Sequence, residues 1–399
     1  MGSPPYLLKT GSAKEDSRKG AKSHSIEIFG MHPLCDSVPL RDTSVKTTQV
    51  AENRFFESPQ AACSPIQTTQ MGSTMKLKYG QIGVGHAHAN KIAVYRQSSD
   101  WEVVGVVEQD PELRQRAEKD PLYRDLKFMT QEQLLNTPGL QVVGVETQVR
   151  DLLKTADDCI AAGKHIHLDK PAGASLPHFK KILDEAARKH LVVQMGYMFR
   201  YSPAVLMLRE FLKNGWLGVP FEVHTVMSKV VPNDDRRKLA EFPGGIMFEL
   251  GCHVIDLVVG VLGKPDSVKS FARKVGPQDD KLLDNMLAVF EYPRAIASVK
   301  SSAVEIDGGD RRQFVVCGSE GTFHIQPLDA PSVRFTLKQP RGKYGKGYQE
   351  IRFGNYPRYV GDAADLAKII RNEKEPDFSY QHDLAVQEAV LWASGVAVE

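Results

Sequence analysis

The feature that most constrains this chain is a series of short, continuous apolar segments that begins at residue 77 and alternates with amphipathic segments. The apolar segments are rich in β-branched residues, which is typical of strands buried on both faces of a sheet. They occur at residues 77–85, 102–108, 141–146, 165–169 and 192–197. Strands that alternate with helices at this spacing predict a parallel sheet flanked by helices.

Beyond about residue 198 the pattern changes, because strands begin to follow one another at hairpin spacing. Consecutive strands of this kind predict an antiparallel sheet, and hence a second domain of the α+β class. The expected elements are a helix near 203–214, a strand at 220–231, a helix from Gly244 to about Val261, a hairpin within 284–305, and helices near 356–373 and 381–396.

The length of 399 residues allows two or three domains at about 150 residues each. Residues 1–74 are rich in Ser, Thr, Lys, Gln and Pro and show no sustained periodicity, so we expect a disordered tail there. We predict a dinucleotide-binding domain at 75–197 and a substrate-binding and dimerisation domain at 198–399.

Charge and hydropathy exclude several classes of function. Lys plus Arg number 51 and Asp plus Glu number 49, so the net charge of +2 offers no field for nucleic acid or an anionic membrane. The best apolar run starts at Val254, contains Asp256, and is shorter than the roughly 20 residues of a membrane span. Five irregularly spaced cysteines form no disulfide framework or CxxC site, which favours a reducing, cytoplasmic compartment.

The first apolar segment ends in a glycine-containing loop that predicts a dinucleotide site. Glycines after a buried strand allow a tight turn close to a pyrophosphate, and the following helix N-terminus attracts its charge. Glu108 ends the next strand, where a carboxylate accepts ribose hydroxyls and repels a 2′-phosphate, so we expect NAD rather than NADP. The expected loop residues are Gly83, Val84, Gly85, His86, Ala87 and His88.

Two alternatives accompany this interpretation. His86 and His88 have the spacing of a metal-binding pair, but no third ligand lies nearby in the sequence, and we expect no metal. The plain alternative for Glu108 is a solvated acidic residue at a strand end.

Two other segments carry residues suited to redox chemistry. Lys170 follows the strand at 165–169, at the sheet edge where ligands of parallel sheets bind. Glu249 and His253 are four residues apart on one expected helix, and Asp256 lies where it would orient the imidazole. Oxidation of an alcohol needs an acceptor for the hydroxyl proton, which histidine provides, and an ammonium stabilises developing negative charge. The plain alternative for His253 is a packed helix histidine.

Four motifs in this order resemble the Gfo/Idh/MocA oxidoreductases, the relatives of glucose–fructose oxidoreductase and inositol dehydrogenase. They are GVGHAH at the first strand, GKHIHLDKPAG, GYMFRYSP, and the helix containing ELGCHVID. The resemblance spans nearly all of residues 76–399. It implies a Rossmann domain followed by an α/β domain with an open, mainly antiparallel sheet, which often forms the interface of a homodimer or homotetramer.

The resemblance also implies roles for single residues. Lys170 matches the lysine of the family's EKP motif beside the cofactor, and His253 matches its catalytic histidine. Glu249 stands where the family has an aspartate, and Thr147 is the one residue retained from its TPN stretch. Substrate contacts are implied for the segment of Tyr197 and Arg200. The sequence departs from the family at Asp169, which replaces the usual Glu, and at Ile246, which replaces a glycine.

From these observations we expect an NAD-dependent dehydrogenase acting on a secondary hydroxyl of a sugar, inositol or related polyol. In this interpretation Lys170, His253 and Glu249 are catalytic, and Tyr197, Arg200 and Asp256 lie at the substrate. The unusual segment after Thr147 keeps a second possibility open, a non-catalytic protein that senses a dinucleotide or sugar. A third possibility is a glycosidase that uses bound NAD for transient oxidation.

Overall fold

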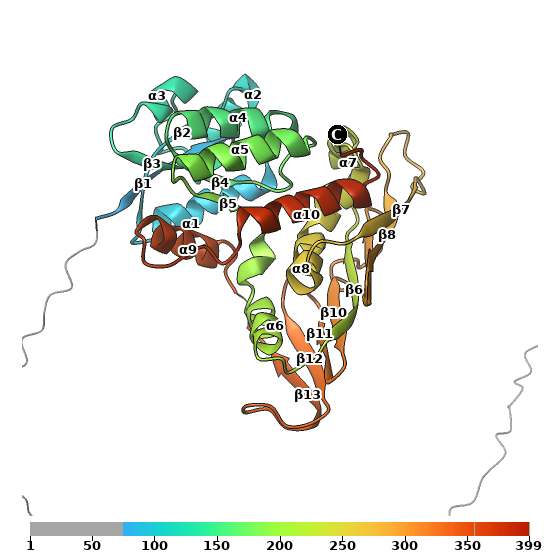
Figure 1. The fold of residues 1–399 in the computed structure, drawn as a ribbon. Helices are drawn as coiled ribbons and strands as arrows, with labels where there is room; N and C mark the ends of the chain where they lie inside the picture. Colours follow the sequence, from blue (N-terminus) through green and yellow to red (C-terminus); the bar gives the residue numbers. More distant parts are fainter. Residues whose placement is uncertain (1–74, 355, 399) are drawn as a thin grey trace, which may run out of the picture. The chain divides into compact units, whose positions relative to one another are not determined.

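The first sheet is fully parallel and forms the core of the N-terminal part of the chain (Figure 1). The computed structural model describes residues 75–354 and 356–398, and the predicted tail at 1–74 lies outside them. The strand order is β2-β1-β3-β4-β5, which confirms the predicted Rossmann arrangement. The strands are β1 (Leu77–Ile82), β2 (Trp101–Val107), β3 (Leu140–Val145), β4 (His165–Leu168) and β5 (Val193–Met195).

Helices cover both faces of this sheet because successive strand residues point in opposite directions. Val143 and its neighbours pack against one layer of helices, and Val142 packs with Tyr79 against another. Asp110 starts one helix by accepting hydrogen bonds from the next two free backbone N–H groups. The helices between the strands are α1 (Ile92–Gln97), α2 (Pro111–Ala117), α3 (Gln131–Leu135), α4 (Val149–Ala161) and α5 (Leu176–Arg188).

The second sheet has eight strands in the order β13-β12-β11-β10-β6-β9-β8-β7. Only β6 and β9 pair in parallel, and the other neighbours are antiparallel, so the sheet is mainly antiparallel as expected. Its strands are β6 (Pro220–Ser228), β7 (Ser267–Arg273), β8 (Asn285–Tyr292), β9 (Ala295–Ser302), β10 (Gln313–Gly318), β11 (Gly321–Ile325), β12 (Ser332–Leu337) and β13 (Gly347–Arg352).

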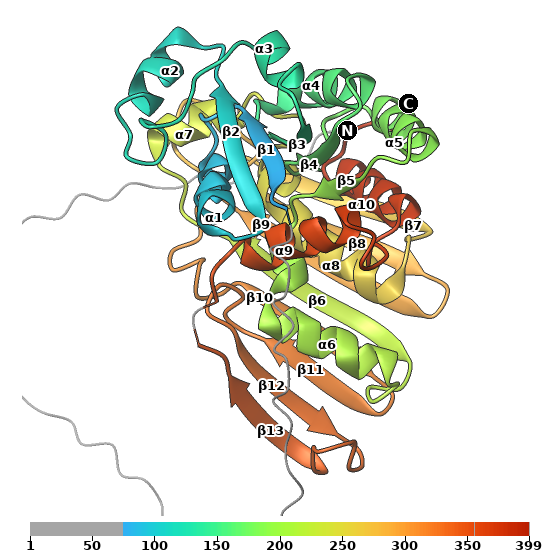
Figure 2. The same ribbon diagram turned by 90° about the vertical axis from the view of Figure 1, so that its left-hand side faces the viewer.

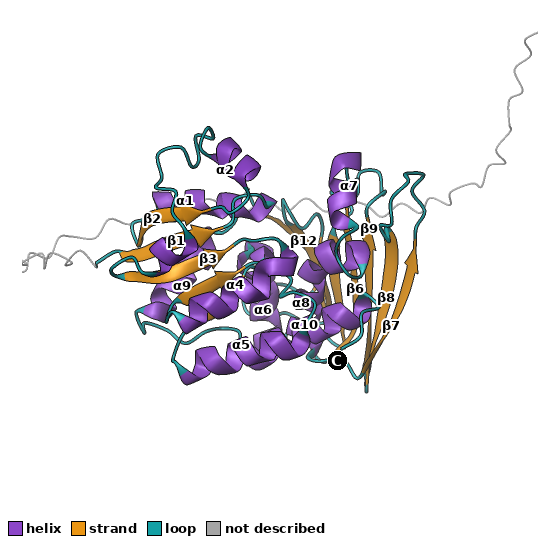
Figure 3. Cartoon of the chain, turned by 90° about the horizontal axis from the view of Figure 1, so that it is seen from above, coloured by secondary structure: helices purple, strands orange, loops and turns teal. Residues whose placement is uncertain are grey.

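Helices lie on one face of the second sheet (Figures 2 and 3). Phe211 of α6 (Pro203–Lys213) packs edge-on against Phe323 and Phe335, and α8 (Cys252–Leu262) and α10 (Tyr380–Ala393) cover β6 and β7. A short helix, α7 (Asn233–Leu239), follows β6. No helix of the described residues is drawn over the opposite face, where Phe271 and Leu287 pair across β7 and β8 and are exposed.

The helix expected from Gly244 differs from the prediction at its start. Gly244 and Gly245 have φ angles of +77° and +58°, and a Cβ atom at Gly244 would lie 2.2 Å from that of Ser394. A π-helical turn at Met247–Gly251 follows and continues as α8. Because a π turn changes which side chains share a face, the spacing of Glu249 and His253 no longer implies that they meet.

The helix α9 (Val360–Ile370) returns to the first sheet, although its residues lie in the C-terminal part of the chain. Ala363, Leu366 and Ala367 join the core that contains Trp101, whose indole N–H donates to the carbonyl of Ala363 at 3.1 Å. The predicted boundary near residue 198 therefore separates the strands of the first sheet from those of the second. The hydrophobic core of the first sheet, however, also includes residues of α9, which lie beyond that boundary. Among residues 75–354 and 356–398 we find no apolar helix of the length that a bilayer crossing requires.

Candidate active site

The loop after β1 contains a tight turn at which only glycine fits, and a second glycine that packs closely against a side chain. Gly83 has a φ of +98°, and a Cβ atom there would lie 2.2 Å from the carbonyl oxygen of Glu146. A Cβ atom at Gly85 would lie 2.6 Å from Leu113. The loop thus runs directly against the loop after β3 and the start of α2. The chain then enters a 3-10 turn at Ala87–Lys91 before α1.

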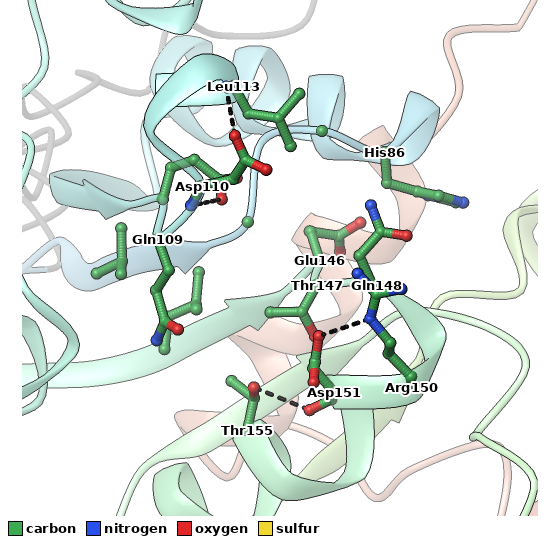
Figure 4. A pocket seen from close by; sticks show the side chains of 15 residues that line it. His86, Gln109, Asp110, Leu113, Glu146, Thr147, Gln148, Arg150, Asp151 and Thr155 are labelled. Carbon is green, nitrogen blue, oxygen red and sulfur yellow. Dashed lines mark hydrogen bonds and ion pairs between the residues drawn. The ribbon is translucent and has the colours of Figure 1, made fainter. Parts of the chain in front are cut away.

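A cavity of about 160 Å³ opens where the loops after β1, β2 and β3 meet (Figure 4). It is lined by Gly83, Gly85, Glu108 and Thr147, all of them residues expected at a dinucleotide. The strand order reverses its direction at β1 and β3, which is where open parallel sheets bind ligands. The hydroxyl of Thr147 is buried with no hydrogen-bond partner in the described part of the chain. These features fit a bound dinucleotide.

Glu108 is held in place by two backbone amides. Val84 N donates to its Oε2 at 2.9 Å, and Asp110 N donates to its Oε1 at 3.0 Å. Each carboxylate oxygen has a second lone pair, so these bonds fix the side chain and leave acceptor capacity for hydroxyl groups. The role of Glu108 at a ribose remains a prediction.

The two loop histidines both contact Asp169. Nδ1 of His86 and Nδ1 of His88 each lie 3.0 Å from a different oxygen of this carboxylate. Burial opposes ionisation of Asp169, but the two imidazoles prevail and hold its pKa well below the usual value. The structure therefore brings a third potential metal ligand to the histidine pair, from 81 residues away in sequence. Lys91 Nζ lies 3.9 Å from the same carboxylate, and its positive charge disfavours a cation there.

A buried ion pair behind the glycine loop was missed by the sequence analysis. Lys91 Nζ lies 2.7 Å from Glu146 Oε1, and both side chains are fully buried. Glu146 N also donates to the carbonyl of Ile82 at 2.7 Å, which ties the loop after β3 to the end of β1. Lys91 lies in the amphipathic segment after the first apolar run, and no local pattern in the sequence relates it to Glu146.

Lys170 and Glu249 form a buried pair between the two parts of the chain. Lys170 Nζ donates to the backbone carbonyl of Glu249 at 2.8 Å and to its Oε1 at 3.2 Å. Burial acts to lower the pKa of Lys170, but the carboxylate of Glu249 outweighs it and the pKa lies above its usual value. The ammonium is therefore permanently charged and is a hydrogen-bond donor rather than a base.

His253 is buried beside Phe199 and His88, with ring centroids 5.7 Å away in both cases. Burial lowers its pKa well below 6.5, and the charge of Lys170 lowers it further. The imidazole is therefore neutral at physiological pH. Its Nδ1 is buried with no hydrogen-bond partner in residues 75–354 and 356–398. A neutral, incompletely bonded imidazole is suited to accepting a proton.

Lys170, Glu249 and His253 line one cavity of about 490 Å³, together with His88. His86 borders both this cavity and the cavity at the dinucleotide loop. The ammonium and the imidazole that were selected from distant motifs are thus brought together, next to the expected cofactor site.

The other three predicted residues are placed differently. The carboxylate of Asp256 accepts hydrogen bonds from Arg200, at 2.6 Å for the shortest, so it does not orient His253 as expected. Arg200 also donates to Asp383 at 2.7 Å and lies 5.0 Å from the ring of Tyr197. Tyr197, Arg200 and Asp256 are at most 2% exposed and do not line the cavity of His253. Their geometry is that of a buried network beside α8, in which the Arg200 cation is paired with the carboxylates of Asp256 and Asp383.

Comparison with known proteins identifies both parts of the chain. Residues 77–197 match the oxidoreductase family model with an NAD-binding Rossmann fold, and residues 205–324 match the GFO/IDH/MocA C-terminal domain. The chain is 24% identical over 315 residues to the uncharacterized oxidoreductase YhhX of Escherichia coli, covering 69% of this chain and 88% of the relative. It is 25% identical over 248 residues to the trans-1,2-dihydrobenzene-1,2-diol dehydrogenase of Sus scrofa, covering 59% and 72%.

Solved structures share the fold at lower identity. The WlbA dehydrogenase of Chromobacterium violaceum, in complex with NADH and UDP-GlcNAcA, has a TM-score of 0.68 at 14% identity, covering 80% of this chain and 92% of that one. An oxidoreductase of Desulfitobacterium hafniense described as NADPH-dependent has a TM-score of 0.67 at 18% identity, covering 80% and 95%. With both domain models matched in order and both sheets as expected, this chain belongs to the Gfo/Idh/MocA family of NAD(P)-binding oxidoreductases.

Proposed function

We propose that this protein is an NAD-dependent dehydrogenase that oxidises a secondary hydroxyl of a sugar, inositol or related polyol. The observation that carries the proposal is the shared cavity of Lys170 and His253 beside the glycine loop. Bound NAD supplies the acceptor for the hydride that leaves the carbinol carbon. A relative named as a diol dehydrogenase agrees with chemistry at a hydroxyl-bearing carbon.

In this proposal one residue stabilises the charge on the substrate oxygen and another accepts the hydroxyl proton. The charged ammonium of Lys170 donates a hydrogen bond to the substrate oxygen and stabilises the negative charge that develops on it. The neutral imidazole of His253 takes the hydroxyl proton as the carbon–oxygen double bond forms. Glu249 acts through Lys170, because its carboxylate and its carbonyl both hold the ammonium in place.

The test incubates the full chain and NAD with a panel of polyols and sugars. Formation of NADH is followed by its absorbance at about 340 nm. The variant H253A should lower kcat by about 10²- to 10⁴-fold, the range of a lost general base, while NAD binding is retained. The matched control is H178Q on α5, whose imidazole bonds to Asp157 and lines neither cavity, and it should leave kcat unchanged.

Other outcomes favour the other two functions. A protein that binds NAD but reduces none of it across the panel would be a sensor of a dinucleotide or sugar. Cleavage of a glycosidic bond without net accumulation of NADH would indicate a glycosidase with transient oxidation. Net NADH formation that H253A abolishes is the outcome expected of the dehydrogenase.

We favour NAD over NADP as the cofactor. The support is the position of the Glu108 carboxylate in the dinucleotide cavity, where it would repel a 2′-phosphate. Solved relatives are named with either form, so the comparison of Kd for NAD and NADP decides the matter. A Kd for NADP equal to or below that for NAD would contradict this choice.

We also propose a homodimer or homotetramer in the cytoplasm, with no nucleic acid or membrane partner. The support for assembly is the face of the second sheet that no described helix covers, with Phe271 and Leu287 exposed on it. The support for the compartment is that Cys159, Cys252 and Cys317 are free thiols.

A further inference from the structure

The cavity of Lys170 and His253 has a second group of basic side chains that the sequence analysis did not single out. Lys229 follows β6, Arg312 precedes β10 and Arg358 precedes α9, and all three line the cavity. Glu249 is the one acidic residue among the described residues that line it, and its carboxylate is already bound to Lys170. The cavity wall therefore carries an excess of positive charge.

The two arginines are oriented by one carboxylate that is not part of the cavity wall. Arg312 and Arg358 pair with different oxygens of Asp329. Arg312 Nε also donates to the carbonyl of Ser228 at 3.1 Å, next to Lys229. A single carboxylate offsets one of the two guanidinium charges, so the arrangement fixes the arginines and leaves net positive charge at the cavity.

Lys229 is the least compensated of these groups. It is half-buried, and within the described residues its ammonium makes no hydrogen bond or ion pair. Burial lowers its pKa, and although Glu249 acts in the opposite direction, the charges of Lys170 and Arg312 lower it further. A partly dehydrated cation beside other cations is unfavourable unless an anion joins it.

A neutral polyol does not satisfy this wall, because Asp329 offsets only one of the three positive charges and hydroxyl groups supply no further counter-charge. We propose that the substrate of this site is a polyol bearing an anionic group, a carboxylate or a phosphate, which Lys229, Arg312 and Arg358 bind while Lys170 and His253 address the reacting hydroxyl. The substrate class is thus a sugar acid or a sugar phosphate. Arg312 and Lys229 do not line the dinucleotide cavity, so they are not positioned for the cofactor's own pyrophosphate. This inference rests on the proposed function only for the roles of Lys170 and His253 at the reacting hydroxyl.

The experiment measures binding separately from turnover. Calorimetric titration of the full chain, loaded with NADH so that no hydride can be accepted, uses glucose, galactose and mannose, each with its uronate and its 6-phosphate as matched anionic probes. At least one anionic probe should bind about tenfold or more tightly than its neutral parent, a difference of about 1.4 kcal/mol. Comparison of the uronate with the 6-phosphate identifies which anion the site takes.

Variants assign the effect to the basic group. K229Q should weaken binding of the preferred anionic probe by about tenfold or more, and K229R should retain most of the affinity because it keeps the charge. Since Lys229 has no partner to lose in the described chain and its charge is opposed by Lys170 and Arg312, K229R should keep the melting temperature of the parent, and K229Q should keep or raise it. K346Q, at an exposed lysine between β12 and β13, is the control and should bind as the parent does.

Two results overturn the inference: no anionic probe binds more tightly than its parent, or K229Q leaves the affinity for the preferred probe unchanged. If anionic probes bind through Lys229 but no substrate in the panel is oxidised, the anion site stands and the dehydrogenase function fails. If neutral polyols are oxidised as efficiently as anionic ones, the dehydrogenase function stands and the anion site fails.

Discussion

At the scale of single residues, the protonation state of His253 connects the structure to the chemistry. Its burial and the nearby Lys170 charge both favour the neutral imidazole. The proton acceptor is therefore available at neutral pH and is lost only when the pH falls well below 6.5. In the proposed mechanism Lys170 has two roles: it donates a hydrogen bond to the substrate oxygen, and its charge lowers the pKa of His253.

This coupling predicts a specific pH dependence. The acid limb of kcat/KM for alcohol oxidation should lie below pH 6.5, because activity falls only where His253 becomes protonated. In K170M the limb should move to higher pH, since the repelling charge is gone, whereas K170R should keep it near the parent position. A pH–rate profile of the three proteins checks this, supported by a ¹⁵N titration of the imidazole. An unmoved limb in K170M would contradict the coupling.

At the scale of elements, α9 joins the C-terminal residues to the first sheet and carries a buried acid. Asp362 is 1% exposed, and neither of its carboxylate oxygens has a hydrogen-bond partner in the described chain. Burial raises its pKa from 3.8 to about 7, although Lys91 and Arg200 act to lower it. The folded protein therefore holds a proton on this group more tightly than the unfolded chain does.

The sign of the resulting pH dependence follows from linkage. The contribution of Asp362 to the free energy of unfolding is fully present below pH 3.8 and is lost as the pH rises through about 7. D362N should therefore stabilise the protein relative to the parent at pH 8 by at least about 1 kcal/mol, and much less at pH 5. Denaturant unfolding at both pH values measures the difference.

A control for this prediction lies on the same helix. Asp365 accepts hydrogen bonds from Tyr201 at 2.8 Å and Lys374 at 2.6 Å. D365N removes a partner from both groups and should give no gain in stability at pH 8. An equal gain from the two variants would show that burial of an unpaired acid is not the cause.

At the scale of the whole molecule, the proposed assembly rests on one exposed face of the second sheet. Leu287 and Phe271 are cross-strand neighbours and are 40% and 53% exposed. Burial of such a face between two copies would remove apolar surface from water, and each Å² buried would stabilise the assembly by about 25 cal/mol. The open sheet is therefore the surface on which the proposed homo-oligomer depends.

The prediction is that L287K, which places a charge at the centre of this pair, shifts the protein from oligomer toward monomer. Size-exclusion chromatography with light scattering measures the mass of the parent and the variant. L206K is the matched control, because Leu206 is 45% exposed but lies on α6, on the helical side of the sheet. A monomeric parent, or equal masses for parent and L287K, would argue against assembly through this face.

Features that depend on residues close together in the sequence were predictable, and contacts between residues far apart in the sequence were not. The alternation of strands and helices, the glycine turn at Gly83 and Gly85, and the candidates Lys170 and His253 rest on local periodicity and spacing, which the chain carries within short windows. Expectations about partners failed where they assumed a regular helix. Asp256 pairs with Arg200 rather than His253, and Glu249 pairs with Lys170, because side-chain neighbours across a fold are set by packing.

The sequence by itself therefore determined the two kinds of sheet and the glycine loop after the first strand, and it supplied the candidates for moving a proton and stabilising charge. Only the tertiary structure decided that Lys170 and His253 share one cavity, and that Asp169 joins the loop histidines. It likewise decided that Lys229, Arg312 and Arg358 gather on the same wall. The physical reason is that burial and charge compensation act between residues distant in sequence, for which no local pattern exists.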